Sequence, residues 1–147
     1  TLSSSSAASD VYKRQSVLHK MIREKNDKVF YVHGETDVSD REAIRGIVEG
    51  SDGAIIVASL GTYSTGINIR NLHNIIFASP SKSQVKVLQS IGRGLRTADN
   101  GQHTTLYDLT DDLTWESKQN YTVKHAGERV KMYNKEQFDV EYHKVEM

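Results

Sequence analysis

The sequence predicts an α/β fold, a parallel sheet with helices on both faces, followed by a helical extension at the C-terminus. Short apolar runs recur along the chain, and amphipathic helical patterns separate them. Two of the runs, 54–58 and 75–78, are almost continuously apolar, as strands are when both of their faces are covered. Strands that alternate with helices imply right-handed crossovers and therefore a parallel sheet.

Each element is justified by its own pattern. A first helix is expected over 16–24, where apolar residues recur at helical spacing, and a strand follows at 29–32. Ser39 opens a second helix, since Glu42 three residues later completes a capping box, and Gly50 can end it. The remaining expected elements are the strands 54–58, 75–78 and 105–109, a helix from Ser81 or Ser83 to Arg96, and a polar turn at 97–103.

The last region, 114–147, is rich in Lys, Glu and Tyr, and part of it is expected to dock on the sheet as a helix. Its apolar face carries Val123, Ala126, Val130 and Tyr133. Interleaved basic residues could touch DNA, although mixed charge on a helix more often indicates a solvated amphipathic face. These basic residues are Lys124, His125, Arg129 and Lys131.

The segment 89–96, Gln-Ser-Ile-Gly-Arg-Gly-Leu-Arg, carries the strongest functional signal. On a helix, Gln89, Arg93 and Arg96 share one face, where the two guanidinium groups repel each other. Each of the two glycines costs a helix about 1 kcal/mol relative to alanine. An anion between the arginines would offset both effects, and a triphosphate matches their forked donors. A solvated basic face would explain two arginines alone, but not the glycines or the apolar spacing on the opposite side.

That segment resembles motif VI of the superfamily 2 helicases, Gln-x-x-Gly-Arg-x-x-Arg. Segment 58–69 resembles motif V, and segment 32–42 resembles the stretch after motif IV, in the order and at the spacing of the family. Segments 64–68 and 107–113 are most similar to phage recombination helicases of the UvsW type. The resemblance runs from about residue 16 to the C-terminus and implies a RecA-like helicase C-terminal domain.

Helicases of this superfamily bind ATP between two RecA-like domains, and the first of these brings the phosphate loop and the magnesium carboxylates. No Gly-x-x-x-x-Gly-Lys-Ser/Thr loop occurs here, and Asp111-Asp112 has the wrong context for a magnesium site. The resemblance therefore implies the second domain alone. Its cofactor would be ATP with Mg held by the missing N-terminal RecA-like domain, and the chain is not expected to be active by itself.

The resemblance also assigns roles to residues. Arg96 becomes the arginine finger, Arg93 a companion contact to the γ-phosphate, and Gln89 either a neighbour of the phosphate or a bridge between the two domains. Gly66 and Asn68 lie at the ribose position of motif V, where the family often has an aspartate in place of Asn68. The residues implied to contact nucleic acid are Ser59, Thr62, Thr65, His33, Gly34 and Arg41.

Two alternatives stay open for that last set. A Ser/Thr-rich turn that satisfies its own backbone explains any single hydroxyl nearly as well. A lone histidine such as His33 in a turn is more often structural than functional. Contacts of this kind follow the phosphate backbone, so no recognition sequence is implied.

Composition sets limits on these assignments. The 147 residues have a net charge of zero, with 19 Lys and Arg against 19 Asp and Glu, which excludes a protein coated in basic charge but not a local groove. There are no cysteines, and the six histidines lack ligand spacing, so no metal site is expected. No apolar run approaches the roughly 20 residues of a membrane span. The expected location is the cytoplasm of a bacterium or phage-infected cell.

Three regions are expected. Residues 1–15 are interpreted as a non-native or disordered leader, because the start is Ser-rich and the stretch is similar to translated sequencing-adaptor read-through, which would mean that the native chain extends further upstream. Residues 16–113 form the RecA-like domain. Residues 114–147 form the helical extension that packs on it.

The leading hypothesis is the C-terminal motor domain of an ATP-dependent DNA helicase or translocase that acts on branched or recombination intermediates. A non-catalytic nucleic-acid-binding or regulatory module is one alternative, although a pure binder has no use for Arg93 and Arg96. Another superfamily 2 machine, such as a restriction translocase or an RNA helicase, is the other.

Overall fold

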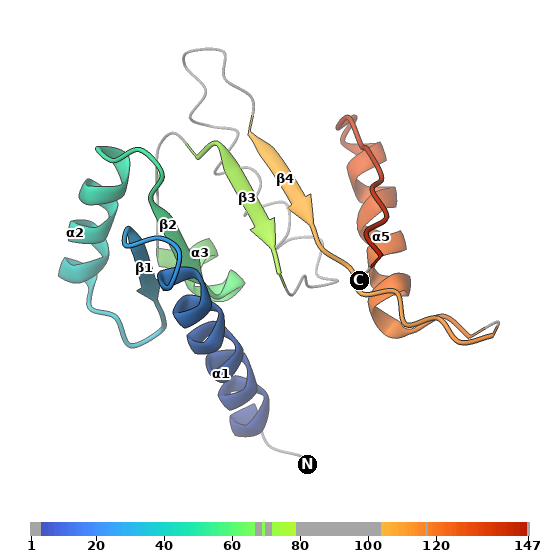
Figure 1. The fold of residues 1–147 in the computed structure, drawn as a ribbon, viewed down its shortest axis with the longest axis horizontal. Helices are drawn as coiled ribbons and strands as arrows, with labels where there is room; N and C mark the ends of the chain where they lie inside the picture. Colours follow the sequence, from blue (N-terminus) through green and yellow to red (C-terminus); the bar gives the residue numbers. More distant parts are fainter. Residues whose placement is uncertain (1–3, 67–68, 70–71, 79–103, 117, 147) are drawn as a thin grey trace.

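The computed structural model describes residues 4–66, 69, 72–78, 104–116 and 118–146. The elements are α1 (Ser4–Arg23), β1 (Val29–Val32), α2 (Val38–Glu49), β2 (Ile55–Ala58), α3 (Leu60–Gly66), β3 (Asn74–Phe77), β4 (Thr105–Asp108) and α5 (Tyr121–Lys135). Figure 1 shows β1 and β2 between α2 on one side and α1 and α3 on the other, with β3 and β4 beyond them and α5 next to β4.

All four expected strands are present, and each lies within one residue of its expected bounds. β1 pairs with β2 in parallel, from Val29 opposite Ile55 to Val32 opposite Ala58. β3 pairs with β4 in parallel, from Asn74 opposite Thr105 to Phe77 opposite Asp108. The α/β class and the parallel pairing predicted from the sequence are therefore confirmed.

Helices cover both faces of β1, because neighbouring side chains of a strand point to opposite sides. The Tyr31 hydroxyl lies 3.4 Å from Gln15 Oε1 of α1. Val32 is fully buried on the other face with Ile69, against Ile44 of α2 and Tyr63 of α3. A second core joins Phe77 of β3 to the C-terminal helix α5, as expected for an extension that docks on the sheet. Its buried residues are Phe77, Met132 and Tyr133, with Ile75, Leu106 and Val130 packed around them.

Three helices differ from expectation. α1 begins at Ser4 and not at residue 16, so residues 4–15, expected to lie outside the fold, continue the helix. This stretch contains no glycine or proline to stop a helix. α2 begins at Val38, after Asp37, which places Ser39 inside the helix and makes the expected capping box wrong. The Glu42 carboxylate instead pairs with Arg45 at 2.6 Å.

The end of α2 agrees with the sequence-based expectation, whereas the short helix α3 was not expected. Gly50 ends α2, as predicted, and the N–H of Ser51, which follows it, donates to the Val48 carbonyl at 3.2 Å. α3 was not expected, because seven residues that include two glycines carry little helical signal. The expected helix ending at Arg96 lies outside the described residues. No described helix has the length and apolar character needed to cross a membrane.

Candidate functional site

The candidate residues that the structure describes meet where β1 and β2 end. The two strands are parallel and in register, so Val32 and Ala58 lie side by side at their carboxyl ends. The segments that follow, 33–36 and 59–62, therefore leave the sheet at the same edge. Ligands of open α/β sheets bind at that edge. His33, Gly34, Ser59 and Thr62 therefore lie at the same edge, and their contact with nucleic acid stays a prediction.

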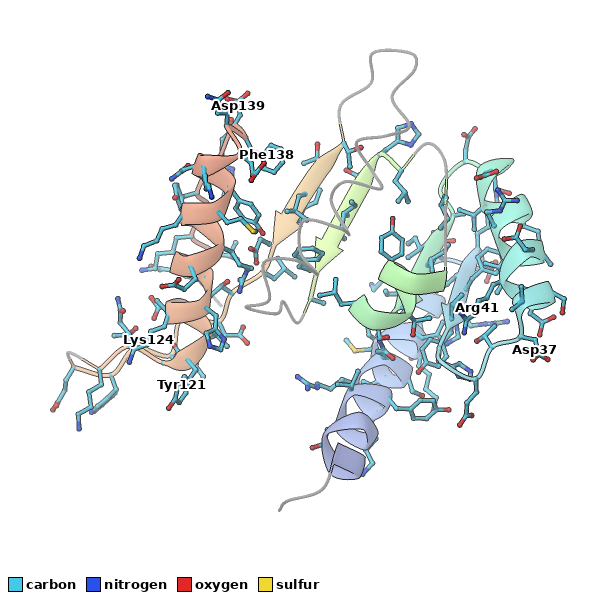
Figure 2. The ribbon with its side chains drawn as sticks, turned by 180° about the vertical axis from the view of Figure 1, so that it is seen from behind. Asp37, Arg41, Tyr121, Lys124, Phe138 and Asp139 are labelled. Carbon is cyan, nitrogen blue, oxygen red and sulfur yellow. The ribbon has the colours of Figure 1, made fainter. Side chains whose placement is uncertain are left out.

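Arg41 holds the turn that follows β1. Its Nε donates to the Thr36 carbonyl at 2.9 Å, and its Nη2 donates to the carbonyls of His33 and Gly34 at 3.2 and 3.1 Å. The same turn is closed by the His33 N–H, which donates to Thr36 Oγ1 at 3.0 Å. Figure 2 shows Arg41 beside Asp37 at the start of α2, next to this turn.

These bonds use Nε and Nη2 of Arg41, whereas its Nη1 forms no hydrogen bond with the described residues. Gly34 is exposed, and a side chain at this position would meet open space among the described atoms. Packing within this part of the chain therefore gives no reason for a glycine here. A molecule that approaches the backbone closely would give one.

The hydroxyls of Ser59 and Thr62 are engaged with each other and with the start of α3. Ser59 Oγ accepts the Thr62 N–H at 3.0 Å and lies 2.7 Å from Thr62 Oγ1. The Ser59 carbonyl accepts the Tyr63 N–H at 2.8 Å, which places Ser59 as the N-cap of the helix. The alternative of a turn that satisfies its own backbone is therefore realised. A role in nucleic-acid contact stays a prediction.

Sequence reasoning missed an aromatic cluster that surrounds His33. The Tyr31 and His33 ring centroids are 5.1 Å apart, and His19 stacks on Tyr31 at 5.5 Å. Tyr12 meets the His33 ring edge-on at 5.9 Å. Burial raises the pKa of the Tyr31 hydroxyl, and the neighbouring Tyr12 raises it further. The signal was the spacing of Tyr12, Gln15 and His19 on one helical face, but two of them lay in the excluded leader.

A second polar site ties α5 to the end of β4. Arg129 is 2% exposed and donates two hydrogen bonds of 2.7 Å to the Asp108 carboxylate, from Nε to Oδ2 and from Nη2 to Oδ1. Nη2 also donates to Thr110 Oγ1 at 3.2 Å, and the Tyr133 hydroxyl donates to Asp108 Oδ2 at 2.9 Å. The suggestion that Arg129 could touch DNA is therefore wrong, because its guanidinium is buried and bound to Asp108 and Thr110.

The other predicted site residues are described only in part or lie outside the described residues. Thr65 and Gly66 lie in the last turn of α3, where the helix backbone alone is described. Asn68, Gln89, Arg93 and Arg96 lie outside the described residues. Among the side chains that the structure does describe, no three His, Asp or Glu residues gather as metal ligands.

Comparison with protein families gives a match to the helicase conserved C-terminal domain over residues 6–98. The ATP-dependent DNA helicase uvsW of Enterobacteria phage T4 is 38% identical over 129 residues, which cover 81% of this chain and 26% of that protein. The putative ATP-dependent helicase IRC3 of Saccharomyces cerevisiae is 26% identical over 92 residues, which cover 63% of this chain and 13% of that protein.

Solved structures give a similar result. The crystal structure of T4 UvsW superposes with a TM-score of 0.69 at 37% identity, and the match covers 86% of this chain and 28% of that one. The C-terminal part of the Fun30 ATPase domain superposes with a TM-score of 0.54 at 17% identity, over 79% of this chain and 43% of that one, which shows a shared fold. The chain thus spans about a quarter of uvsW, 26% of its length.

Proposed function

This chain belongs to the helicase conserved C-terminal domain family and is similar to phage T4 uvsW, and from that premise we propose that it is the C-terminal motor domain of an ATP-dependent DNA helicase or translocase. The observation that carries the proposal is the shared edge after β1 and β2. Residues from two segments that resemble helicase motifs lie together there, although they are far apart in the sequence.

At that edge the chain would follow the nucleic-acid backbone. Arg41 fixes the turn of His33 and Gly34 by three carbonyl bonds, so the exposed backbone at Gly34 is held ready for close approach. Ser59 and Thr62 stand at the neighbouring segment. Contacts from backbone groups, hydroxyls and one guanidinium fix position without reading bases. We therefore propose binding that is independent of base sequence.

The ATP-binding part of the proposal rests on Gln89, Arg93 and Arg96, with Gly66 and Asn68 near the ribose. Two arginines on one helical face match phosphate oxygens as bidentate donors. Bound ATP would supply the free energy for movement along the nucleic acid. Arg96 would neutralise charge on the phosphoryl group during transfer, an effect worth roughly 10³–10⁵ in rate. The phosphate loop and the magnesium ligands would come from an N-terminal RecA-like domain.

The biological setting is proposed from the similarity to uvsW, a phage DNA helicase. We propose branched or recombination intermediates as substrates, a role in DNA recombination and repair, and action in the cytoplasm of a bacterium or phage-infected cell. Residues 16–113 would form the motor domain, and residues 114–147 the extension fixed to it through Asp108 and Arg129.

The test is steady-state ATP hydrolysis with and without DNA, on the complete protein that joins this chain to its N-terminal domain. DNA should stimulate turnover, Arg96→Ala should lower the rate by orders of magnitude, and Arg96→Lys should rescue it poorly because an ammonium lacks the planar fork. Lys131→Gln, an exposed change on α5, is the control and should leave the rate unchanged.

Two results would contradict the proposal. One is an unchanged rate in Arg96→Ala together with a large loss of thermal stability, which would make Arg96 a structural residue. The other is DNA-stimulated hydrolysis by the present chain alone. That activity would mean that the catalytic site does not depend on a partner domain.

A further inference from the structure

The connection between β4 and α5 exposes two aromatic side chains. Trp115 is 78% exposed and Tyr121 is 80% exposed, and each stands apart from both apolar cores of the described chain. Aromatic rings are among the largest apolar surfaces a protein can bury, so exposing two of them within seven residues leaves much stabilisation unused. Exposed apolar groups that gather in one place mark a binding surface.

A tight hairpin places Trp115 next to a lysine. The Trp115 N–H donates to the Lys118 carbonyl at 3.3 Å, and the Lys118 N–H donates back to the Trp115 carbonyl at 3.0 Å. Glu116, in the turn between them, has a φ of 54°, a left-handed value that such tight turns require. Residues that pair directly across two antiparallel strands project from the same face. Trp115 and Lys118 therefore share one face of the hairpin.

An open pocket adjoins that hairpin. It has a volume of about 500 Å³ and is lined by Lys118, Gln119, Tyr121 and Lys124. Lys124 Nζ lies 5.9 Å from the centre of the Tyr121 ring, so a cation and an aromatic face are presented together. Figure 2 shows Tyr121 and Lys124 at the first turn of α5, where the helix backbone adds partial positive charge. We call Trp115 and these four lining residues the hairpin pocket.

The positive charge of the two lysines in the hairpin pocket is available to a ligand. Neither Lys118 nor Lys124 forms an ion pair with a carboxylate of the described residues, whereas Lys131 pairs with Glu128 at 3.6 Å and Lys144 with Glu146 at 3.2 Å. The lining contains no carboxylate. Glu116, in the turn of the hairpin, forms no ion pair with either lysine, and Asp112 accepts hydrogen bonds from the N–H and the hydroxyl of Thr114.

We propose that the hairpin pocket binds an unpaired nucleotide of a single-stranded nucleic acid. The base would stack on Trp115 or Tyr121, and the adjoining phosphates would bind Lys118 and Lys124. Stacking on aromatic faces combined with a cationic track is how proteins hold single strands without choosing a sequence. An acidic peptide would satisfy the lysines but leave both rings exposed.

This site is additional to the edge after β1 and β2. It lies after residue 98, where the helicase family match ends, and in Figure 2 it is on the opposite side of the molecule from Arg41. The choice of nucleic acid as the ligand rests on the proposed function. The site itself rests on Trp115, Tyr121 and the two lysines, and it would guide a strand that has been separated from its complement.

The chain offers a direct reporter, because Trp115 is its single tryptophan. Titration of the full 147-residue chain with a short oligothymidylate at low salt should quench Trp115 fluorescence to saturation. A blunt duplex of equal length should quench it much less, since its bases are already stacked. Tyr121→Ala should weaken oligonucleotide binding by about fivefold or more, and Trp115→Ala, followed by anisotropy of a labelled oligonucleotide, should do the same.

Matched variants separate charge from fold. Lys124→Gln should also weaken binding, whereas Lys131→Gln on the same helix should leave it unchanged. Thermal melts of all variants should coincide with that of the parent chain, because the altered side chains are exposed.

Three results would overturn the proposal. In the first, anisotropy shows binding but Trp115 fluorescence does not change, so the strand binds elsewhere. In the second, polyglutamate or vesicles with anionic lipid quench Trp115 as strongly as the oligonucleotide does. In the third, the variants bind as tightly as the parent chain. The ATP hydrolysis test with Arg96→Ala does not involve this pocket, so failure of the two proposals can be told apart.

Discussion

Arg129 shows how a single buried charge can define the relation between two elements. Its planar fork meets Asp108 with two short bonds, and Tyr133 fills a further acceptor site of the same carboxylate. A buried ion pair of this kind adds little net stability compared with apolar residues, but it is costly to break on one side. Its effect is to fix where α5 docks on β4.

Removal of the guanidinium should therefore be strongly destabilising. Arg129→Met is expected to lower the free energy of unfolding by about 3 kcal/mol, the low end for a broken buried pair, because Asp108 keeps 18% of its side chain exposed to water. Urea unfolding measures this change, and Lys131→Gln is the exposed control. The double variant Arg129→Met/Asp108→Leu should recover more than half of the loss. Equal midpoints for Arg129→Met and the parent chain would contradict the role assigned to this pair.

Tyr133 adds a pH dependence to the same contact. Burial, and then the Asp108 carboxylate, raise the pKa of Tyr133 above its ordinary value of 10.0. A folded-state pKa above the unfolded one means that the folded chain holds its proton longer, so this contribution is complete below pH 10 and is lost as the pH rises above it. The free energy of unfolding should fall above about pH 10, and less steeply in Tyr133→Phe. The same slope in both proteins would show that other groups govern the alkaline limit.

At the scale of elements, α3 is capped by Ser59, a residue that also belongs to the proposed nucleic-acid contact. The helix has seven residues, two of them glycine, and it begins directly after β2. Ser59 supplies the cap that such a weak helix needs, because its Oγ accepts the Thr62 N–H. The cap and the proposed phosphate contact use the same hydroxyl, so a substitution must be chosen to separate the two roles.

Three substitutions at Ser59 make that separation. Ser59→Ala removes the cap and should cost about 1 kcal/mol of stability, whereas Ser59→Asn and Ser59→Asp keep a capping oxygen and should stay within about 0.5 kcal/mol. If phosphates pass this edge, Ser59→Asp alone adds repulsion and should weaken DNA binding several-fold, with Ser59→Asn as its neutral control. Thermal melts and DNA titrations give the two readouts. Identical DNA affinity for the Asn and Asp variants would remove Ser59 from the nucleic-acid contact.

The same elements show what could be read from the sequence. Strands such as 54–58 were located to within a residue, because a continuous apolar run between turn residues has few alternative structures. The start of α2 was misplaced because Asp37 and Ser39 are both acceptable caps, and their relative merit depends on the turn that Arg41 fixes. The aromatic cluster was missed because Tyr12 and Gln15 lay in the excluded leader. The Asp108–Arg129 pair joins residues 21 positions apart, and single-chain patterns do not encode such pairing.

At the scale of the whole molecule, charge is balanced, with 19 basic residues against 19 acidic ones. Affinity for nucleic acid must therefore arise locally and not from the overall field. In the described part of the chain, two proposed sites would supply it: the edge after β1 and β2, with Arg41, and the hairpin pocket, with Lys118 and Lys124. Figure 2 shows Arg41 and Lys124 on opposite sides of the molecule, so one strand must cross the molecule to engage both.

This arrangement predicts how binding should depend on salt. Each neutralised phosphate of a single strand contributes about −0.7 to the slope of log K against log salt, so contacts from Arg41, Lys118 and Lys124 together give a slope of about −2. The double variant Lys118→Gln/Lys124→Gln removes two of these cations and should reduce the slope by about 1.4, while Lys131→Gln leaves it unchanged. Anisotropy titrations between 50 and 200 mM salt, roughly the range over which such slopes are defined, provide the measurement. A slope near zero would mean that stacking alone holds the strand. A slope steeper than about −4 would require more phosphate contacts than these three side chains can make, and would move the main binding surface elsewhere on the chain.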